Sequence, residues 1–150
     1  MRAPYQTLSI PYKTIDGIRY YCVLHRADCD MWQFIAGGGE DGEEPAVTAM
    51  REIFEEGGLT VEGVTPLRSM AYIPTTIFPN IKSYNWPSDT YVVPEYAFAF
   101  ECNEEIVISH EHTEYVWLTF DEAYTKLYWD SNRAALYELD CRLSGFDINK

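Results

Sequence analysis

The hydrophobic residues of the chain gather in short runs of aromatic and β-branched side chains, a pattern that predicts β-strands. Two such runs, at residues 5–12 and 18–24, flank Asp16-Gly17, a dipeptide that favours a tight turn. The sequence therefore predicts that the chain begins with a β-hairpin. Further strands are expected at 32–36, 60–73, 91–102 and 115–120.

Between residues 45 and 57 the pattern changes to helical spacing. Pro45 suits the first position of a helix, and the Gly57-Gly58 pair suits its end. Apolar residues form one stripe along this predicted helix, so one side can be buried while the opposite side faces a cleft. The stripe consists of Ala46, Ala49, Met50 and Ile53.

Two more helices are expected near the C-terminus. Residues 121–128 indicate a short helix that begins at an aspartate, Asp121. A last helix is expected to be capped by Asp130 or Ser131 and to end near Gly145. Its buried face would carry Leu136, Leu139 and Leu143.

Strands and helices thus mix along the chain, which predicts an α+β fold. No internal repeat or interdomain linker interrupts the 150 residues, so we expect a single domain over 1–150. No apolar run approaches the ~20 residues of a membrane span and no signal-peptide core follows the first residues, which indicates a cytoplasmic protein and no membrane partner. The four cysteines lack CxxC or zinc-type spacing, and we expect reduced, mostly packed thiols.

The charge is strongly acidic, with 11 Lys plus Arg against 24 Asp plus Glu and a net charge of −13. This balance argues against a nucleic acid polymer as partner. Many of the acids lie in the segment 37–59, so even a small anionic substrate would need a metal ion there.

Three glutamates on the first predicted helix, Glu52, Glu55 and Glu56, stand at i, i+3 and i+4. At about 100° per residue they share an arc of roughly 100° on one helix face. They also lie in the last turns, where the helix dipole disfavours negative charge. The arrangement is therefore explained best by a divalent cation with oxygen ligands, Mg²⁺ or Mn²⁺ in its place.

The segment resembles the signature of the Nudix hydrolase family: Gly, any five, Glu, any seven, Arg-Glu, an aliphatic residue, any one, Glu-Glu, any one, Gly and an aliphatic residue. Every signature position is filled, which makes the motif specific. The resemblance implies a mixed β-sheet between helices, an α/β/α sandwich, and metal-assisted attack of water on a phosphoanhydride. The matching residues are Gly37, Glu43, Arg51, Glu52, Ile53, Glu55, Glu56, Gly58 and Leu59.

The same resemblance assigns roles within the segment. Metal binding is carried over to Glu52, Glu55 and Glu56, with the carbonyl of Ala36 as a further ligand, and either Glu55 or Glu56 serves as general base. Arg51 is interpreted as an organiser of the glutamates, and Glu43 as a tie for the loop. The glycine run 37–39 predicts tight backbone curvature or an ordinary turn.

Residues outside the motif resemble the bacterial dihydroneopterin triphosphate pyrophosphatases, also described as dATP pyrophosphohydrolases. That group releases pyrophosphate from a pterin or purine nucleoside triphosphate and leaves the monophosphate. Glu111 matches a further metal-binding glutamate of the group. The alternative is that Glu111 is only an exposed acid on a loop. The other matching points are Trp32-Gln33, His112, Tyr115, Trp117-Leu118, Trp129 and Ser131-Asn132-Arg133.

Candidate substrate contacts follow from this second resemblance. Arg26 and Arg133 are expected to bind phosphate, unless they form only surface salt bridges. Trp32 is expected to stack on a flat base or pterin ring, or else to belong to the core. Gln33 and Asn132 complete the predicted substrate site.

The proline-rich segment 73–96 predicts a lid or a specificity loop. Pro74 stands 15 residues after Leu59, a placement associated in the family with ADP-ribose pyrophosphatases. ADP-ribose or another nucleoside-diphosphate-X compound is therefore the second candidate substrate. A protein without enzymatic activity would be a nucleotide sensor or a protein-interaction domain, and whether aromatic side chains of this loop support a homodimer stays open.

Overall fold

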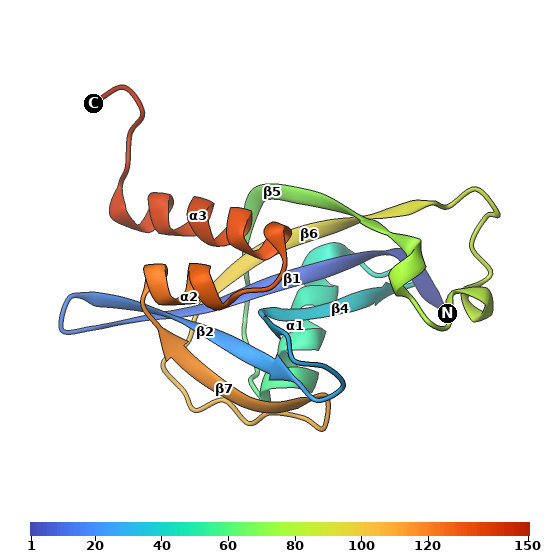
Figure 1. Cartoon of the computed structure of the whole chain (residues 1–150), viewed down its shortest axis with the longest axis horizontal. Helices are drawn as coiled ribbons and strands as arrows, with labels where there is room; N and C mark the ends of the chain where they lie inside the picture. The colour runs from blue at the N-terminus through green and yellow to red at the C-terminus, as the bar shows by residue number, and fades with distance from the viewer.

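The computed structural model describes all 150 residues, which form a seven-stranded sheet with three α-helices (Figure 1). The helices are α1 (Pro45–Gly57), α2 (Phe120–Lys126) and α3 (Asp130–Ser144). No helix is long and apolar enough to cross a membrane. The strands are β1 (Arg2–Ile15), β2 (Ile18–Arg26), β3 (Trp32–Gln33), β4 (Ile35–Glu40), β5 (Thr65–Pro74), β6 (Val92–Glu101) and β7 (His112–Leu118).

The long strand β1 organises the sheet. Its C-terminal part forms the predicted hairpin with β2, which pairs Tyr12 with Tyr21, and its N-terminal part pairs with β4. Along its other edge β1 runs parallel to β6, from the pair Gln6 and Glu95 to the pair Tyr12 and Glu101. Since the remaining pairings are antiparallel, the predicted mixed sheet is confirmed.

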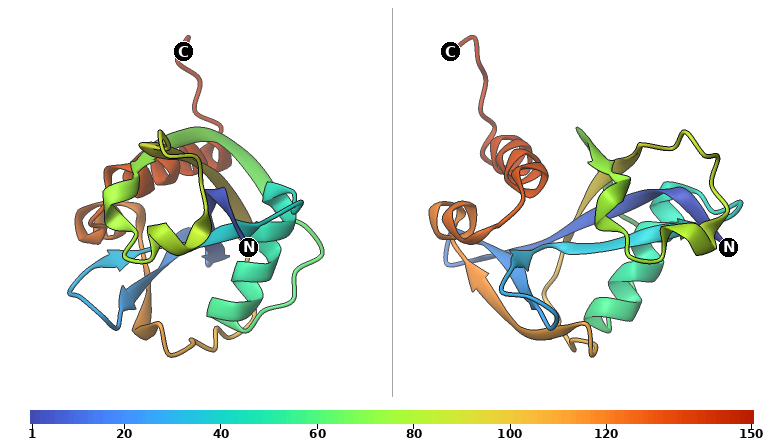
Figure 2. Two further views of the ribbon diagram at one scale, coloured as in Figure 1. Left: turned by 90° about the vertical axis from the view of Figure 1, so that its right-hand side faces the viewer. Right: turned by 45° about the vertical axis from the view of Figure 1, so that its right-hand side comes forward.

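The sheet buries both of its faces. On β2, Tyr21 and Val23 belong to one apolar cluster, whereas Cys22 and Leu24 belong to the other, as the alternation of side chains along a strand requires. The first cluster includes residues of α2 and α3, and the second includes Ile53 of α1. Helix α1 therefore covers one face and α2 and α3 the opposite face, which confirms the predicted α/β/α sandwich (Figures 1 and 2).

Several element boundaries differ from the predictions. The strand expected at 60–73 begins only at Thr65. Helix α2 begins at Phe120 because Thr119 and Glu122 form a capping box, in which the Thr119 N–H and hydroxyl donate to Glu122 Oε1 over 3.1 and 2.8 Å. The cap of α3 is Trp129, without a side-chain hydrogen bond, so the predicted cap at Asp130 or Ser131 is wrong.

The glycine run does not make the predicted turn. Gly37, Gly38 and Gly39 lie in β4, and none of them has positive φ. What they provide is space, because a Cβ atom on each would overlap the Glu52 carboxylate, the Arg2 guanidinium and the Tyr5 ring, respectively. The prediction of tight curvature is therefore wrong, and close packing against β4 is the reason for these glycines.

The proline-rich segment is shorter than predicted, because β5 extends to Pro74 and β6 begins at Val92. Residues 75–91 form an excursion with two 3-10 turns, Thr75–Ile77 and Ile81–Tyr84, which lies beside the N-terminus (Figure 2). Arg2 holds this excursion: its guanidinium lies 4.6 Å from the centre of the Phe78 ring, and its carbonyl accepts a 2.9 Å hydrogen bond from Trp86 Nε1.

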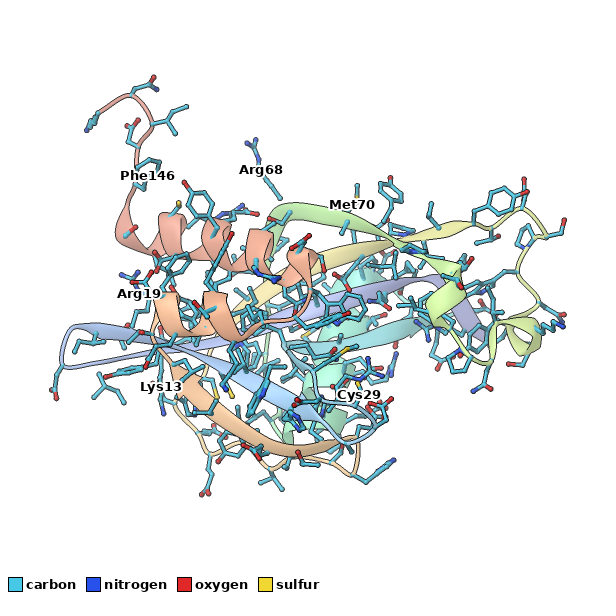
Figure 3. The ribbon with its side chains drawn as sticks, viewed as in Figure 1. Lys13, Arg19, Cys29, Arg68, Met70 and Phe146 are labelled. Carbon is cyan, nitrogen blue, oxygen red and sulfur yellow. The ribbon has the colours of Figure 1, made fainter.

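All four cysteines are free. Cys22 and Cys102 are buried, and burial raises the pKa of both thiols. Cys29 lies in the loop after β2 (Figure 3), and Cys141 is half-buried on α3. The structure thus contains no disulfide that would constrain the fold.

Candidate active site

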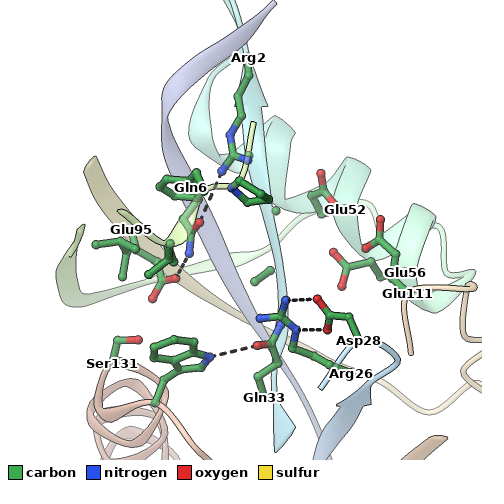
Figure 4. A pocket seen from close by; sticks show the side chains of 18 of the residues that line it. Arg2, Gln6, Arg26, Asp28, Gln33, Glu52, Glu56, Glu95, Glu111 and Ser131 are labelled. Atoms are coloured by element: carbon green, nitrogen blue, oxygen red, sulfur yellow. Dashed lines mark hydrogen bonds and ion pairs between the residues drawn. The ribbon is translucent and has the colours of Figure 1, made fainter. Parts of the chain in front are cut away.

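One cleft of about 1270 Å³ opens between α1, the loop before β7, the start of α3 and the excursion after β5. It is roomy enough for a nucleoside triphosphate, since ligand pockets commonly measure about 300–1,000 Å³. Carboxylates of Glu52, Glu56 and Glu111 lie on one side of it, and Gln6 and Glu95 lie on the other (Figure 4). The cleft is also lined by Glu55, by Gly37 and by Ala36, whose backbone carbonyl is a predicted metal ligand.

Arg51 connects the motif residues to one another. Its Nε and Nη2 donate to the two carboxylate oxygens of Glu43 over 3.0 and 2.9 Å. Nη1 donates to Glu52 over 2.9 Å and to Glu55 over 3.3 Å. Nη2 also reaches the Gly38 carbonyl at 2.9 Å, which ties α1 to β4. The guanidinium thus orients Glu52 and Glu55, two of the predicted metal ligands.

Glu43 anchors this arrangement from the loop before α1. Besides Arg51, its carboxylate accepts the hydroxyl of Thr48 and the N–H of Glu40, the latter over 3.1 Å. The Arg51 guanidinium is the largest cause that lowers the pKa of Glu43 to about 2. A carboxyl group with a lowered pKa stabilises the fold above its unfolded pKa of about 4.3, and this contribution is lost as the pH falls towards 2.

Glu52 and Glu56 sit in a different environment from Glu43. Both are buried, with 8% and 2% of their surfaces exposed, and burial raises the pKa of each. The neighbouring carboxylates of Glu52 and Glu111 raise the pKa of Glu56 further. One oxygen of Glu56 has no hydrogen-bond partner, although His112 Nε2 lies 3.7 Å from the other. Burial lowers the pKa of His112, which disfavours the charged imidazolium beside Glu56.

The donor set suits a hard divalent cation. Carboxylate oxygens are the ligands that Mg²⁺ prefers, and the unpartnered Glu56 oxygen is a buried acceptor without a donor. In the structure no three acidic, histidine or cysteine side chains converge tightly enough to hold an ion as they stand. Glu52 and Glu55 are turned towards Arg51, so a bound cation would require small side-chain rotations of these two residues.

We expect Mg²⁺ to raise the melting temperature of the protein, because it would offset the repulsion between Glu52, Glu56 and Glu111. At a hundred times its Kd, a ligand stabilises by about 2.7 kcal/mol, or about 5–10 °C for a chain of this size. Thermal unfolding with Mg²⁺ or EDTA measures the shift. The Mg²⁺-dependent rise in melting temperature should persist in Glu101→Gln, which changes an exposed acid on β6. It should largely disappear in Glu56→Gln. An equal melting temperature with and without Mg²⁺ in the parent would contradict the cation site.

Three of the predicted substrate residues line the cleft. Arg26 is one of them, and its Nε and Nη2 donate to the Asp28 carboxylate over 2.8 and 2.6 Å. This carboxylate partly neutralises the positive charge of the Arg26 guanidinium. Gln33 accepts a 3.1 Å hydrogen bond from Trp129 Nε1. Asn132 is buried, and its Oδ1 accepts the Phe34 N–H over 2.9 Å.

The two remaining predicted substrate residues, Trp32 and Arg133, do not line the cleft. The Trp32 ring packs against the first apolar cluster, with Lys126 Nζ 4.5 Å from its centre. Arg133 donates to the Tyr128 carbonyl at 3.1 Å and to Asp130 at 3.2 Å. The structure therefore favours a core tryptophan over base stacking, and a surface salt bridge over phosphate binding.

Trp32→Ala is accordingly expected to act on stability rather than on substrate binding. Removing a half-buried indole should cost on the order of 2–3 kcal/mol, somewhat less than the about 3–5 kcal/mol of a fully buried one. Urea unfolding measures this loss, and KM for dihydroneopterin triphosphate should stay within about threefold of the parent value. A tenfold rise in KM at unchanged stability would instead place the ring against the substrate.

Sequence reasoning missed several residues on the far side of the cleft. Arg2, Gln6 and Glu95 come from strands, where a single polar residue carries no motif. The parallel pairing of β1 with β6 brings Gln6 opposite Glu95, and only the topology shows this. Trp129 matches a position of the related pyrophosphatases without a predicted role, and its indole lies in the cleft.

Comparison with known proteins agrees with this architecture. Residues 18–139 match the profile of the NUDIX domain. A dihydroneopterin triphosphate diphosphatase of Haemophilus influenzae is 30% identical over 121 residues, which cover 79% of this chain and 76% of that protein. The protein of the same description from Escherichia coli K12 is 28% identical over 123 residues, covering 81% and 82%.

Solved structures give the same result. A NUDIX hydrolase of Listeria monocytogenes is 44% identical, with a TM-score of 0.83 over 95% of this chain and 96% of that one. The Escherichia coli dihydroneopterin triphosphate pyrophosphohydrolase is 26% identical, with a TM-score of 0.73 over 99% and 98%.

The family profile covers well over half of the chain, so the chain belongs to the Nudix hydrolase family. It is a Nudix pyrophosphohydrolase, an enzyme that acts on small phosphoanhydrides. Its similarity to the dihydroneopterin triphosphate diphosphatases bears on the substrate, which is a separate question.

Proposed function

We propose that the protein hydrolyses a nucleoside or pterin triphosphate, of the dATP or dihydroneopterin triphosphate type, to the monophosphate and pyrophosphate in the presence of Mg²⁺. The observation that carries the proposal is the acidic patch of Glu52, Glu55, Glu56 and Glu111, which gathers four carboxylates on one side of a cleft. Arg51 pairs with only Glu52 and Glu55, so the patch keeps an excess of negative charge that a divalent cation would offset. The similarity to enzymes described by this activity supports the substrate class.

In this proposal Glu52, Glu55, Glu56 and Glu111 hold Mg²⁺ (or Mn²⁺), together with the Ala36 carbonyl. The bound ion would neutralise phosphate charge and lower the pKa of a water molecule. Arg51 positions Glu52 and Glu55 through its hydrogen bonds.

Either Glu55 or Glu56 accepts the proton of the attacking water. Glu56 is the better placed of the two, because one of its oxygens is unpartnered whereas a Glu55 oxygen is held by Arg51. Arg26 and Asn132 lie where the phosphates and the remainder of the substrate can contact them. All these residues belong to one chain, so the proposal applies equally to a monomer and to a homodimer.

A panel of substrates tests the proposal. Release of pyrophosphate and of phosphate is measured with Mg²⁺ for dihydroneopterin triphosphate, dATP, 8-oxo-dGTP and ADP-ribose. We expect pyrophosphate from the pterin or purine triphosphates, with no phosphate. Preferred turnover of ADP-ribose would favour the second candidate substrate, for which Pro74 in the cleft lining is the supporting observation. Absence of turnover, with Glu56→Gln binding nucleotide like the parent, would indicate a nucleotide sensor instead.

A further inference from the structure

Glu95 is a buried acid that the proposed hydrolysis does not use. It lies on β6, is only 4% exposed and lines the cleft on the side away from Glu52, Glu56 and Glu111 (Figure 4). Gln6, its partner in the parallel β1–β6 pairing, donates a hydrogen bond from Nε2 to Glu95 Oε2. This amide fixes one carboxylate oxygen and leaves further acceptor positions available.

No cation accompanies this carboxylate. Glu95 takes part in none of the ion pairs of the structure, although a buried carboxylate without a positive partner is costly. Burial raises the pKa of Glu95, and hydrogen bonds from Gln6 and Ser131 oppose that rise. A buried acid that lines a cleft, has no cationic partner and is held by the neutral Gln6 amide is typical of a ligand-binding residue.

The acceptor character of Glu95 restricts the chemistry of its ligand. A carboxylate binds best to two adjacent N–H donors, because both of its oxygens can then accept. The pyrimidine edge of a pterin or of guanine offers such a pair, namely the 2-amino group and the neighbouring ring N–H. Adenine instead presents an amino group beside a ring nitrogen with a lone pair, which a carboxylate repels.

We propose that Glu95 determines specificity by binding the 2-amino-4-oxo-pyrimidine edge of a pterin or guanine ring, so that adenine is disfavoured. The ring then lies at the Glu95 side of the cleft and the phosphates lie at the acidic patch on α1. The inference rests on the proposed function, because it assumes that the ligand is a triphosphate. The selectivity for the base can nevertheless be measured by binding alone, without any hydrolysis.

The test is Glu95→Gln, which replaces one acceptor with a donor and so matches the adenine edge. The side-chain carbonyl can still accept the Gln6 amide, so the fold has a direct replacement for that hydrogen bond. The matched control is Glu101→Gln, the same substitution at an exposed position of the same strand. Thermal unfolding establishes that all three proteins are folded.

Binding of the α,β-imido analogues of dGTP and dATP is measured by titration calorimetry with Mg²⁺ present. We expect the parent and Glu101→Gln to bind the guanine analogue at least about tenfold more tightly than the adenine analogue. In Glu95→Gln this preference should fall at least about tenfold. A preference that stays within about threefold of the parent, or an equal loss for both analogues, would overturn the inference and leave Glu95 with a structural role.

The outcome separates this inference from the proposed function. If the parent hydrolyses triphosphates while Glu95→Gln leaves base preference unchanged, only the inference fails. If no triphosphate is hydrolysed while base preference shifts in Glu95→Gln, the inference holds and the proposed function fails.

Discussion

Replacing Glu56 with glutamine is expected to lower kcat by at least about a hundredfold while the protein stays folded, the scale of a lost general base or a disturbed metal site. The substitution keeps the size of the side chain and removes its charge. Because the Glu56 carboxyl is 2% exposed and carries an unpartnered oxygen, the neutral amide should be tolerated or even stabilising in the absence of metal. Steady-state release of pyrophosphate from dihydroneopterin triphosphate measures the effect.

Glu55→Gln is expected to show a loss of the same order for a different reason. Its carboxylate is half-exposed and bonded to Arg51 at 3.3 Å, so the change affects the arrangement around Arg51 as well as the patch. The matched control is Glu44→Gln, at the exposed start of α1 and outside the cleft, which should retain parent activity. Near-full activity in both Glu55→Gln and Glu56→Gln would remove the proposed mechanism.

Replacing Gly37 with alanine is expected to produce the second large loss, again about a hundredfold or more in kcat/KM. The added methyl group would occupy the place of the Glu52 carboxylate. That carboxylate is the end of a flexible side chain, so it can move aside at a modest cost in stability. Displacing it, however, separates Glu52 from Arg51 and from the acidic patch.

Gly63→Ala provides the matched control, because no atom lies within 4 Å of a Cβ built at Gly63. It should leave activity and stability near those of the parent. Steady-state kinetics and urea unfolding on both variants distinguish the two positions. Parent-like kcat/KM in Gly37→Ala would contradict the assigned role of Glu52, and a large loss of stability without loss of activity per folded molecule would do the same.

The motif helix was predictable because its signals are local. Pro45 at the start, the Gly58 stop in the left-handed conformation and the periodic glutamates all act within a few residues. The hairpin at Asp16-Gly17 was predictable for the same reason, since both residues have the positive φ that its turn requires.

The glycines of β4 show where local reasoning fails. A run of glycines usually indicates a turn, yet here each glycine makes room for a side chain distant in sequence. The surroundings of Trp32 and Glu95 likewise depend on residues that are distant in sequence. A tryptophan beside a glycine loop resembles a stacking platform, whereas Glu95 resembles any polar residue on a strand. The pairing of β1 with β6 places Glu95 in the cleft, and half-buried Trp32 packs against the apolar cluster that includes residues of α2.

Metal-dependent cleavage at the acidic patch of α1 is tested most directly by the products that the purified parent protein forms from dihydroneopterin triphosphate, measured by ³¹P NMR with Mg²⁺ and with EDTA. We expect the monophosphate and pyrophosphate in equal amounts with Mg²⁺, and no conversion after Mg²⁺ is removed. Stepwise release of phosphate, or the same conversion in EDTA, would contradict the claim that this patch supports metal-dependent cleavage of the phosphoanhydride.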